Sequence, residues 1–160
     1  MTINVGDTIP SMKLKHMTAN GPAEISTDEI FGGKKVVLFS VPGAFTPTCS
    51  AKHLPGFVEK ASALKSKGVN TIACLAVNDA FVMGAWGKAQ NVGDNVLMLA
   101  DGSATFSKAL GLELDLVAMG LGVRGKRFSM MVENGVVKKL NIEAPGEFKI
   151  SDAETMLAQL

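Results

Sequence analysis

The sequence predicts an α/β domain with a central sheet flanked by helices. Short runs rich in β-branched residues alternate with amphipathic stretches along the chain, which is the pattern of strands and helices packed in layers. Three of the runs are compact and mostly apolar, as expected of strands with both faces buried. No repeat, linker or low-complexity segment divides the 160 residues, so we expect one domain over residues 1–160.

The first half of the chain predicts the inner strands and the helix that connects two of them. The expected strands are Lys35–Val41, Val69–Val77 and Val96–Ala100. Between the first two, residues 50–67 carry apolar side chains at helical spacing with Lys and Glu opposite, which predicts a crossover helix. Pro55-Gly56 lies inside this helix, and because proline lacks a backbone donor we expect a kink there.

Two shorter helices are expected next. One covers Ala80–Gln90, and another follows Asp101-Gly102-Ser103, where the Ser103 hydroxyl is expected to cap the first turn.

The last third of the chain predicts a hairpin and a closing helix. Strands Arg127–Val132 and Val136–Asn141 flank an Asn134-Gly135 step, which supplies the positive φ of a tight hairpin turn. Ser151 and Glu154 then fit an S-x-x-E capping box. The helix that follows carries an apolar stripe of Met156, Leu157 and Leu160.

Composition excludes several classes of protein. The 16 Lys+Arg and 15 Asp+Glu give a net charge of +1, so no basic excess points to nucleic acid. The 47% of apolar residues is too high for a disordered chain. The longest apolar run, residues 36–44, is far shorter than the roughly 20 residues that span a bilayer. The start lacks the features of a signal or transit peptide, so we expect a cytoplasmic chain without membrane contact.

The two cysteines and two histidines do not form a metal site or a disulfide framework. Cys49 and Cys74 are too far apart for a CxxC motif, and His16 and His53 supply no metal-ligand spacing. We therefore expect a reduced protein with no metal and no bound cofactor.

The candidate catalytic residues lie mainly in the loop Val41–Cys49, which follows a buried strand and leads into a helix. Unpaired backbone N–H groups at a helix N-terminus favour negative charge, so a cysteine in the first turn is favoured as a thiolate. The hydroxyl of Thr46, three residues earlier, can reach toward the sulfur. Pro42 restricts the loop and can shield the thiolate. The position alone fits equally well a small buried Cys49, with Thr46 as a helix cap.

These residues resemble a known family. Pro42-x-x-x-Thr46-x-x-Cys49, within VPGAFTPTCSAKHLPGF, resembles the active-site signature of peroxiredoxins, specifically the peroxiredoxin-5-like group with the plant type II enzymes. Four further stretches agree: Ala73–Val82, Leu99–Ala104, Gly120–Ser129 and Gly146–Phe148.

The resemblance implies a thioredoxin-like fold with a central mixed sheet, and a thiol peroxidase. Cys49 would attack hydrogen peroxide or an organic hydroperoxide and become sulfenic acid. Arg127, which precedes Phe128, matches the family's catalytic arginine, and Pro42 and Thr46 would complete the site. The planar guanidinium of Arg127 can donate to a peroxide oxygen and a thiolate together.

Two neighbouring residues each have two possible roles. Arg124 is either a member of the site or a surface charge at a strand entrance. His53, one turn after Cys49, either helps to orient the site or is a structural, hydrogen-bonded histidine.

Recycling of the oxidised cysteine is expected to need another molecule. The segment after Cys74 has no cysteine, so the C-terminal resolving cysteine of animal members is absent. Cys74 matches a cysteine of plant type II members, but it lies within the apolar run Thr71–Val77 and is interpreted mainly as a packing residue. We predict a one-cysteine peroxidase whose reductant is glutathione with glutaredoxin, or thioredoxin.

The resemblance also implies a homodimer. Phe45, Phe81 and Trp86 are candidates for its interface, with ordinary core packing as the alternative.

Two other functions fit the sequence less well than a peroxidase. A redox sensor needs only a reactive cysteine, whereas Pro42, Thr46 and Arg127 are all present here. Disulfide exchange is disfavoured because no CxxC motif occurs.

Overall fold

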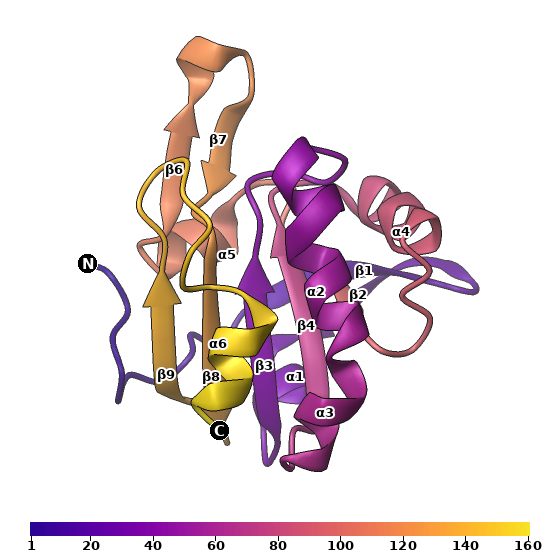
Figure 1. Cartoon of the computed structure of the whole chain (residues 1–160). Coiled ribbons are helices and arrows are strands. Elements are labelled where there is room, and N and C mark those ends of the chain that lie inside the picture. The colour runs from indigo at the N-terminus through magenta and orange to yellow at the C-terminus, as the bar shows by residue number, and fades with distance from the viewer.

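The computed structural model describes residues 1–160 and has a seven-stranded sheet in the order β2-β1-β5-β4-β3-β8-β9. A separate pair, β6 and β7, projects beyond one end of this sheet (Figure 1). The strands are β1 (Lys13–Thr18), β2 (Gly21–Ser26), β3 (Lys35–Ser40), β4 (Thr71–Ala76), β5 (Leu97–Ala100), β6 (Glu113–Leu116), β7 (Gly122–Gly125), β8 (Phe128–Glu133) and β9 (Val136–Ile142). The helices are α1 (Thr27–Phe31), η1 (Cys49–His53), α2 (Leu54–Glu59), α3 (Ala61–Ser66), α4 (Ala80–Ala89), α5 (Thr105–Ala109), η2 (Val117–Met119) and α6 (Ala153–Ala158).

The sheet is mixed, as expected. Strands β3, β4 and β5 are parallel, while β8 pairs antiparallel with β3 and β9 pairs antiparallel with β8. The three parallel strands lie at the centre because their apolar runs can be buried on both faces. The prediction of a central mixed sheet flanked by helices is therefore confirmed.

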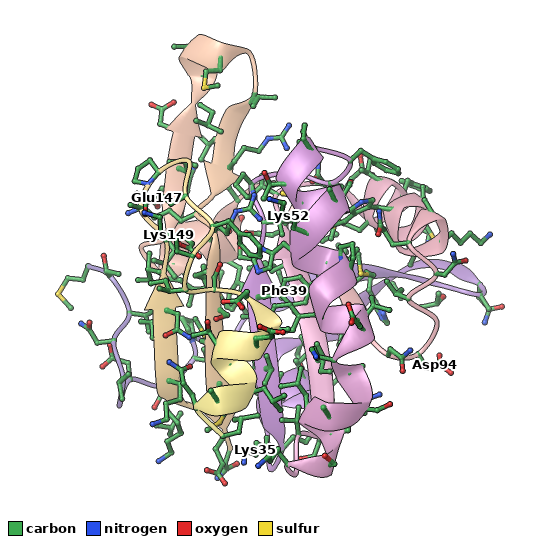
Figure 2. All side chains as sticks on the ribbon, viewed as in Figure 1. Lys35, Phe39, Lys52, Asp94, Glu147 and Lys149 are labelled. Atoms are coloured by element: carbon green, nitrogen blue, oxygen red, sulfur yellow. The ribbon has the colours of Figure 1, made fainter.

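Helices cover both faces of the sheet. Helices α2, α3, α4 and α6 lie on one face, and α1 and α5 lie on the other (Figure 1). Alternate residues of β3 point to opposite faces: Val37 and Phe39 belong to the first core, and Val36 and Leu38 to the second. Phe39, which is labelled in Figure 2, stacks on Phe57 of α2 with ring centroids 4.1 Å apart.

Sheet register brings distant segments to one end of the sheet. Ser40, the last residue of β3, pairs with Phe128, the first residue of β8, and Phe128 pairs with Ile142, the last residue of β9. Arg127 therefore stands at the edge where β3 continues into the loop that leads to Cys49. A backbone hydrogen bond from Glu143 N to Arg127 O, 3.0 Å, extends the β8–β9 pairing to this edge.

The crossover helix differs from the expectation of one kinked helix over residues 50–67. It begins with the π-helical turn η1, in which Leu54 N donates to Cys49 O. Pro55 stands at the start of α2, and its missing N–H removes the regular bond to the residue four positions earlier. A second break occurs at Lys60 (φ −92°, ψ 6°), which separates α2 from α3.

Both predicted helix caps are wrong. The helix after Asp101-Gly102-Ser103 is capped by Asp101, whose carboxylate accepts from the N–H groups of Phe106 and Ser107. Ser103 is not the cap because Ala104 adopts a left-handed conformation (φ 60°) that turns the chain back over Asp101.

At the closing helix the cap is one residue later than predicted. Asp152, not Ser151, accepts from Thr155 N. The Ser151 hydroxyl donates to Glu143 instead.

The remaining expected elements are present, and several others were not expected. Strands β3, β4, β5, β8 and β9 and helix α4 agree with the prediction within a few residues, and the β8–β9 turn has positive φ at Asn134 and Gly135. The β1–β2 hairpin, α1 and the β6–β7 pair were not predicted. The Asn20-Gly21 step at the first hairpin was an available signal. None of the helices is long and apolar enough to cross a membrane.

The packing of α3 on the sheet predicts a stability difference between two leucines. Leu64 is fully buried in the first core, and we expect Leu64→Ala to lower the free energy of unfolding by about 2–5 kcal/mol, since it leaves a cavity. Leu121, 38% exposed beside β7, is the control. Leu121→Ala should change the free energy of unfolding by about 0.5 kcal/mol or less. Urea unfolding measures both, and equal losses would contradict this description of the core.

Candidate active site

The loop between β3 and η1 is fixed by hydrogen bonds at several points. Ala44 N donates to Asn78 Oδ1 at 2.9 Å, which ties the loop to the segment after β4. The Thr46 hydroxyl donates to Gly43 O at 2.7 Å, and Ser50 N donates to Thr46 O at 2.9 Å. Phe45 has a positive φ of 63°, which is uncommon for a residue with a side chain. These contacts set where Cys49 begins η1.

Cys49 is fully buried and receives a hydrogen bond from Arg127. The Nη2 atom of Arg127 lies 3.1 Å from Cys49 Sγ, and the two residues are 78 positions apart in sequence. A guanidinium is permanently charged at neutral pH, so the sulfur faces a fixed positive group. The structure thus brings together the cysteine and the arginine that the sequence singled out.

His53 lies on the other side of the same guanidinium. Arg127 Nη1 donates to His53 Nδ1 at 2.8 Å, and His53 Nε2 lies 3.0 Å from Ser151 O. A carbonyl oxygen only accepts, so Nε2 carries the proton and Nδ1 accepts from the arginine. Burial lowers the pKa of His53 to about 3, and the Arg127 charge acts in the same direction, against the Ser151 carbonyl and Glu143. The ring is therefore neutral at physiological pH.

Aromatic rings surround His53 on three sides. Its ring centroid lies 5.0 Å from that of Phe39, 5.6 Å from that of Phe57 and 4.9 Å from that of Phe148. The Phe148 ring also lies 5.6 Å from the Arg127 guanidinium carbon, within the range of a cation–π contact. The imidazole is thus packed in one orientation.

Glu143 organises the loop that carries the Ser151 carbonyl. Its Oε2 accepts, each at 2.8 Å, from the N–H groups of Lys149, Ile150 and Ser151 and from the Ser151 hydroxyl. Burial acts to raise the pKa of Glu143, but the Ser151 hydroxyl and the three amides outweigh it and leave the pKa below its ordinary value. Figure 2 shows Lys149 and Glu147 on this loop, which follows β9.

Helix α4 and its C-cap residue Gln90 hold the start of η1. Trp86 Nε1 donates to Ser50 Oγ at 3.0 Å, and Gln90 Nε2 donates to Ser50 O at 3.2 Å. Trp86 is fully buried, so of the two alternatives for this residue, subunit interface or core, the structure shows core packing. Phe45 and Phe81 are 55% and 67% exposed.

Three other predicted site residues make no hydrogen bond to the sulfur. Pro42 and Thr46 lie in the loop itself, and Arg124 of β7 lies beside it. The Thr46 hydroxyl faces Gly43 O rather than Cys49, so its oxygen can only accept further hydrogen bonds. Arg124 donates to Pro42 O at 3.2 Å and to Leu121 O at 2.8 Å. Both partners are backbone carbonyl oxygens, and one of them belongs to Pro42 of the loop.

Cys74 lies in the middle of β4, between Phe39 of β3 and Met98 of β5. Its side chain is fully buried in the same core as Cys49, and both thiols are free. Burial raises the pKa of Cys74 well above its usual range, the neighbouring Cys49 raises it further, and Arg127 opposes them. The thiol is therefore protonated at neutral pH.

A small cavity opens beside the arginine. Its volume is about 150 Å³, and its lining includes Pro42, Thr48, Arg127 and Glu143. This space is large enough for a few water molecules or a small polar substrate.

The sequence did not single out Glu143, Ser151 or Ser50 for the site. Glu143 had one available signal, because it is an acidic residue directly after an apolar strand and before Pro145-Gly146. Ser50 and Ser151 offered none, since their contacts depend on segments far away in the sequence.

Comparisons with known proteins find relatives over nearly the whole chain. The sequence model of the Redoxin family matches residues 4–157. The chain is 52% identical to the chloroplastic peroxiredoxin-2E-2 of Oryza sativa subsp. japonica, over 99% of this chain and 73% of that protein.

Two solved structures have the same fold over nearly the whole chain. Reduced Prx3 from Vibrio vulnificus in complex with hydrogen peroxide has a TM-score of 0.95 and 54% identity, with 99% of each chain covered. Peroxiredoxin 5 from Alvinella pompejana has a TM-score of 0.86 and 35% identity, with 98% of this chain and 96% of that chain covered.

The buried neutral His53 predicts a loss of stability in mild acid. The folded chain protonates His53 only near pH 3, whereas an unfolded histidine takes up its proton near pH 6.5. Between these values the unfolded state binds more protons, so the free energy of unfolding falls as the pH falls. The contribution of this one proton is at most about 1.4 kcal/mol per pH unit.

Urea unfolding between pH 7 and pH 4 measures this slope. The free energy of unfolding of His53→Gln should fall less steeply with pH than that of the wild type. His16→Gln, which removes the other histidine, should have the same slope as the wild type. Parallel curves for the wild type and His53→Gln would contradict a neutral, buried His53.

Proposed function

The chain belongs to the redoxin family and is a peroxiredoxin, and on this premise we propose that Cys49 is its peroxidatic residue. A peroxiredoxin is a thiol peroxidase, an oxidoreductase. We propose hydrogen peroxide and organic hydroperoxides as its substrates. The observation that carries the assignment is the hydrogen bond from Arg127 to Cys49 Sγ, 3.1 Å, beside a small cavity that Arg127 also lines.

The proposed first step is attack of the Cys49 thiolate on the terminal oxygen of the hydroperoxide. The S–O bond forms as the O–O bond breaks, sulfur is oxidised by two electrons, and the departing oxygen takes a proton to leave as water or an alcohol. The product is Cys49 sulfenic acid. The reduced Vibrio vulnificus protein binds hydrogen peroxide, which supports the same substrate here.

Hydrogen-bonding groups beside the sulfur are suited to this step. Negative charge develops on the leaving oxygen, and a donor placed to meet it contributes about 10²–10³ in rate. Arg127 is placed to donate to the peroxide as well as to Cys49 Sγ. The Thr46 oxygen, whose proton is committed to Gly43 O, can accept from the O–H of the hydroperoxide and orient it. Pro42 is among the residues that line the cavity.

We propose that the sulfenic acid is reduced by an external thiol, either glutathione with glutaredoxin or thioredoxin. The thiol displaces water from the sulfenic acid to form a mixed disulfide, and a second thiol releases Cys49 as the disulfide product leaves. Cys74 is a poor alternative because its thiol is protonated, buried and held between two strands. No bound cofactor is needed, since the two thiol groups that end as the disulfide product supply both electrons.

Access for a large thiol requires local opening around Cys49. The sulfur is fully buried, and η1 is held down by the hydrogen bonds from Trp86 and Gln90 to Ser50. The sulfenic acid is reached only when this short turn moves. Free cysteines fit a reducing compartment such as the cytoplasm, where glutathione is abundant.

Turnover measured with substoichiometric protein tests the proposed function. We expect wild type and Cys74→Ser to consume many equivalents of hydrogen peroxide and tert-butyl hydroperoxide with glutathione and glutaredoxin, or with thioredoxin. Cys49→Ser should be inactive with every reductant. Because neither substitution changes the charge of the chain, the two are matched controls for each other.

Two outcomes would contradict parts of this proposal. Consumption of only one equivalent of peroxide with every reductant would favour a redox sensor over a peroxidase. Loss of turnover in Cys74→Ser, with the single reaction of Cys49 retained, would make Cys74 the resolving residue.

We also propose a homodimer that covers the exposed aromatic side chains beside the active-site loop. Phe45 and Phe81 are exposed, and the Phe45 ring lies 6.4 Å from that of Trp86, which anchors η1. Burial of two such rings from each subunit would be favourable. Sedimentation should therefore give about twice the chain mass of 16.7 kDa.

A charged substitution tests this interface. Phe81→Glu should shift the protein to a monomer, while Val5→Glu, at a residue that is 59% exposed near the N-terminus, should leave the dimer intact. A monomeric wild type, or a Phe81→Glu variant that remains dimeric, would contradict the proposal.

A further inference from the structure

We propose that Glu143, Ser151 and His53 act as a positioning chain that holds the Arg127 side chain against Cys49. The inference rests on the proposed function, in which Cys49 and Arg127 act on the peroxide. It assigns to a buried carboxylate, a backbone carbonyl and an imidazole the task of orienting the arginine.

The first link is the contact between His53 and Arg127. The two terminal nitrogens of the guanidinium have different acceptors, His53 Nδ1 at 2.8 Å and Cys49 Sγ at 3.1 Å. Two acceptors at fixed positions define the plane of a guanidinium, whereas one would leave it free to rotate. The neutral His53 ring suits this task, because a charged ring would have no acceptor to offer and would repel the arginine.

The second link is the Ser151 carbonyl, which fixes the tautomer of His53. Its oxygen accepts from His53 Nε2 at 3.0 Å, so the proton stays on Nε2 and the Nδ1 lone pair stays directed at Arg127. The three aromatic rings around His53 prevent the imidazole from turning over. The direction of the arginine therefore depends on where the Ser151 carbonyl lies.

The third link is Glu143, which sets the position of that carbonyl. One carboxylate oxygen gathers three successive N–H groups, of residues 149–151, and the Ser151 hydroxyl. Hydrogen bonds to a charged acceptor are stronger than neutral ones, and four of them constrain the peptide that ends in the Ser151 carbonyl. A loop without regular structure becomes a fixed support.

Glu143 is also joined to the arginine through the backbone. Glu143 N donates to Arg127 O at 3.0 Å, at the end of the β8–β9 pairing. The chain of contacts thus closes on itself, from the Arg127 backbone through Glu143, Ser151 and His53 to the Arg127 side chain. A closed arrangement of this kind fixes the guanidinium relative to its own strand.

A double-mutant cycle separates positioning from ordinary structural support. The variants are His53→Phe, which keeps an aromatic ring, Arg127→Ala, and the two combined. The readout is the second-order rate constant for oxidation of Cys49 by hydrogen peroxide in a single turnover. We expect His53→Phe to lower it about 10-fold in the presence of Arg127 and less than about 2-fold in its absence, since coupled residues are non-additive.

Two further variants keep the test decisive if His53→Phe folds poorly. His53→Gln offers one acceptor and one donor on a planar group, and should recover the rate to within about 3-fold of wild type. Glu143→Gln removes the charge with little change in size and should lower the rate about 3- to 10-fold, in line with a loss of charged hydrogen bonds. Glu59→Gln, at an exposed position of α2, is its matched control.

The outcomes distinguish this inference from the proposed function beneath it. An equal loss from His53→Phe with and without Arg127 would overturn the positioning chain while leaving Cys49 and Arg127 in their roles. A wild-type rate in both His53→Phe and Glu143→Gln, with a lowered free energy of unfolding, would overturn it in the same way. A wild-type rate in Arg127→Ala would overturn the positioning chain and the proposed role of Arg127, whereas an active Cys49→Ser would overturn the proposed function itself.

Discussion

The hydrogen bond between Arg127 and the Cys49 sulfur depends on the pairing of β3 with β8. These strands are antiparallel, and the partnership of Ser40 with Phe128 places the start of β8 beside the end of β3. The loop after β3 leads to Cys49, and Arg127 directly precedes β8, so the two residues meet although 78 positions separate them. A shift of one residue in this register would turn Arg127 toward the other face of the sheet. The central sheet thus determines the chemistry at its edge.

The two charged groups near this edge, the buried Glu143 and the half-buried Arg127, have different kinds of hydrogen-bond partner. Glu143 is surrounded by amide and hydroxyl donors, and Arg127 donates to a neutral imidazole and to sulfur. A carboxylate paired directly with Arg127 would compete with Cys49 for its donors. With His53 between them, Glu143 can order the site while the guanidinium stays available to sulfur and peroxide. Burial of a charge requires such hydrogen bonds in any case.

Residues with local signals could be predicted from the sequence. The inner strands follow from their apolar runs, the β8–β9 hairpin from Asn134-Gly135, and the candidate Cys49 and Arg127 from a motif. What escaped prediction depends on tertiary contacts. The π-helical turn at Cys49 reflects both Pro55 and the bonds from α4, and the Ser151 hydroxyl binds Glu143 instead of capping α6. A capping pattern describes only the hydrogen bonds that a side chain can make with its own helix. At Ser151 a buried carboxylate from another segment, Glu143, accepts the hydroxyl instead.

The rate of Cys49 oxidation in an Arg127→Lys protein is the most direct test of the central claim. Trp86, the only tryptophan, donates to Ser50 beside Cys49, so its fluorescence can follow oxidation in a stopped-flow experiment. Lysine keeps the charge but cannot donate in a planar fork to histidine, sulfur and peroxide together. A fall of about 100-fold in the second-order rate constant with hydrogen peroxide is expected. A constant within about 3-fold of wild type would show that charge alone suffices and would contradict this account.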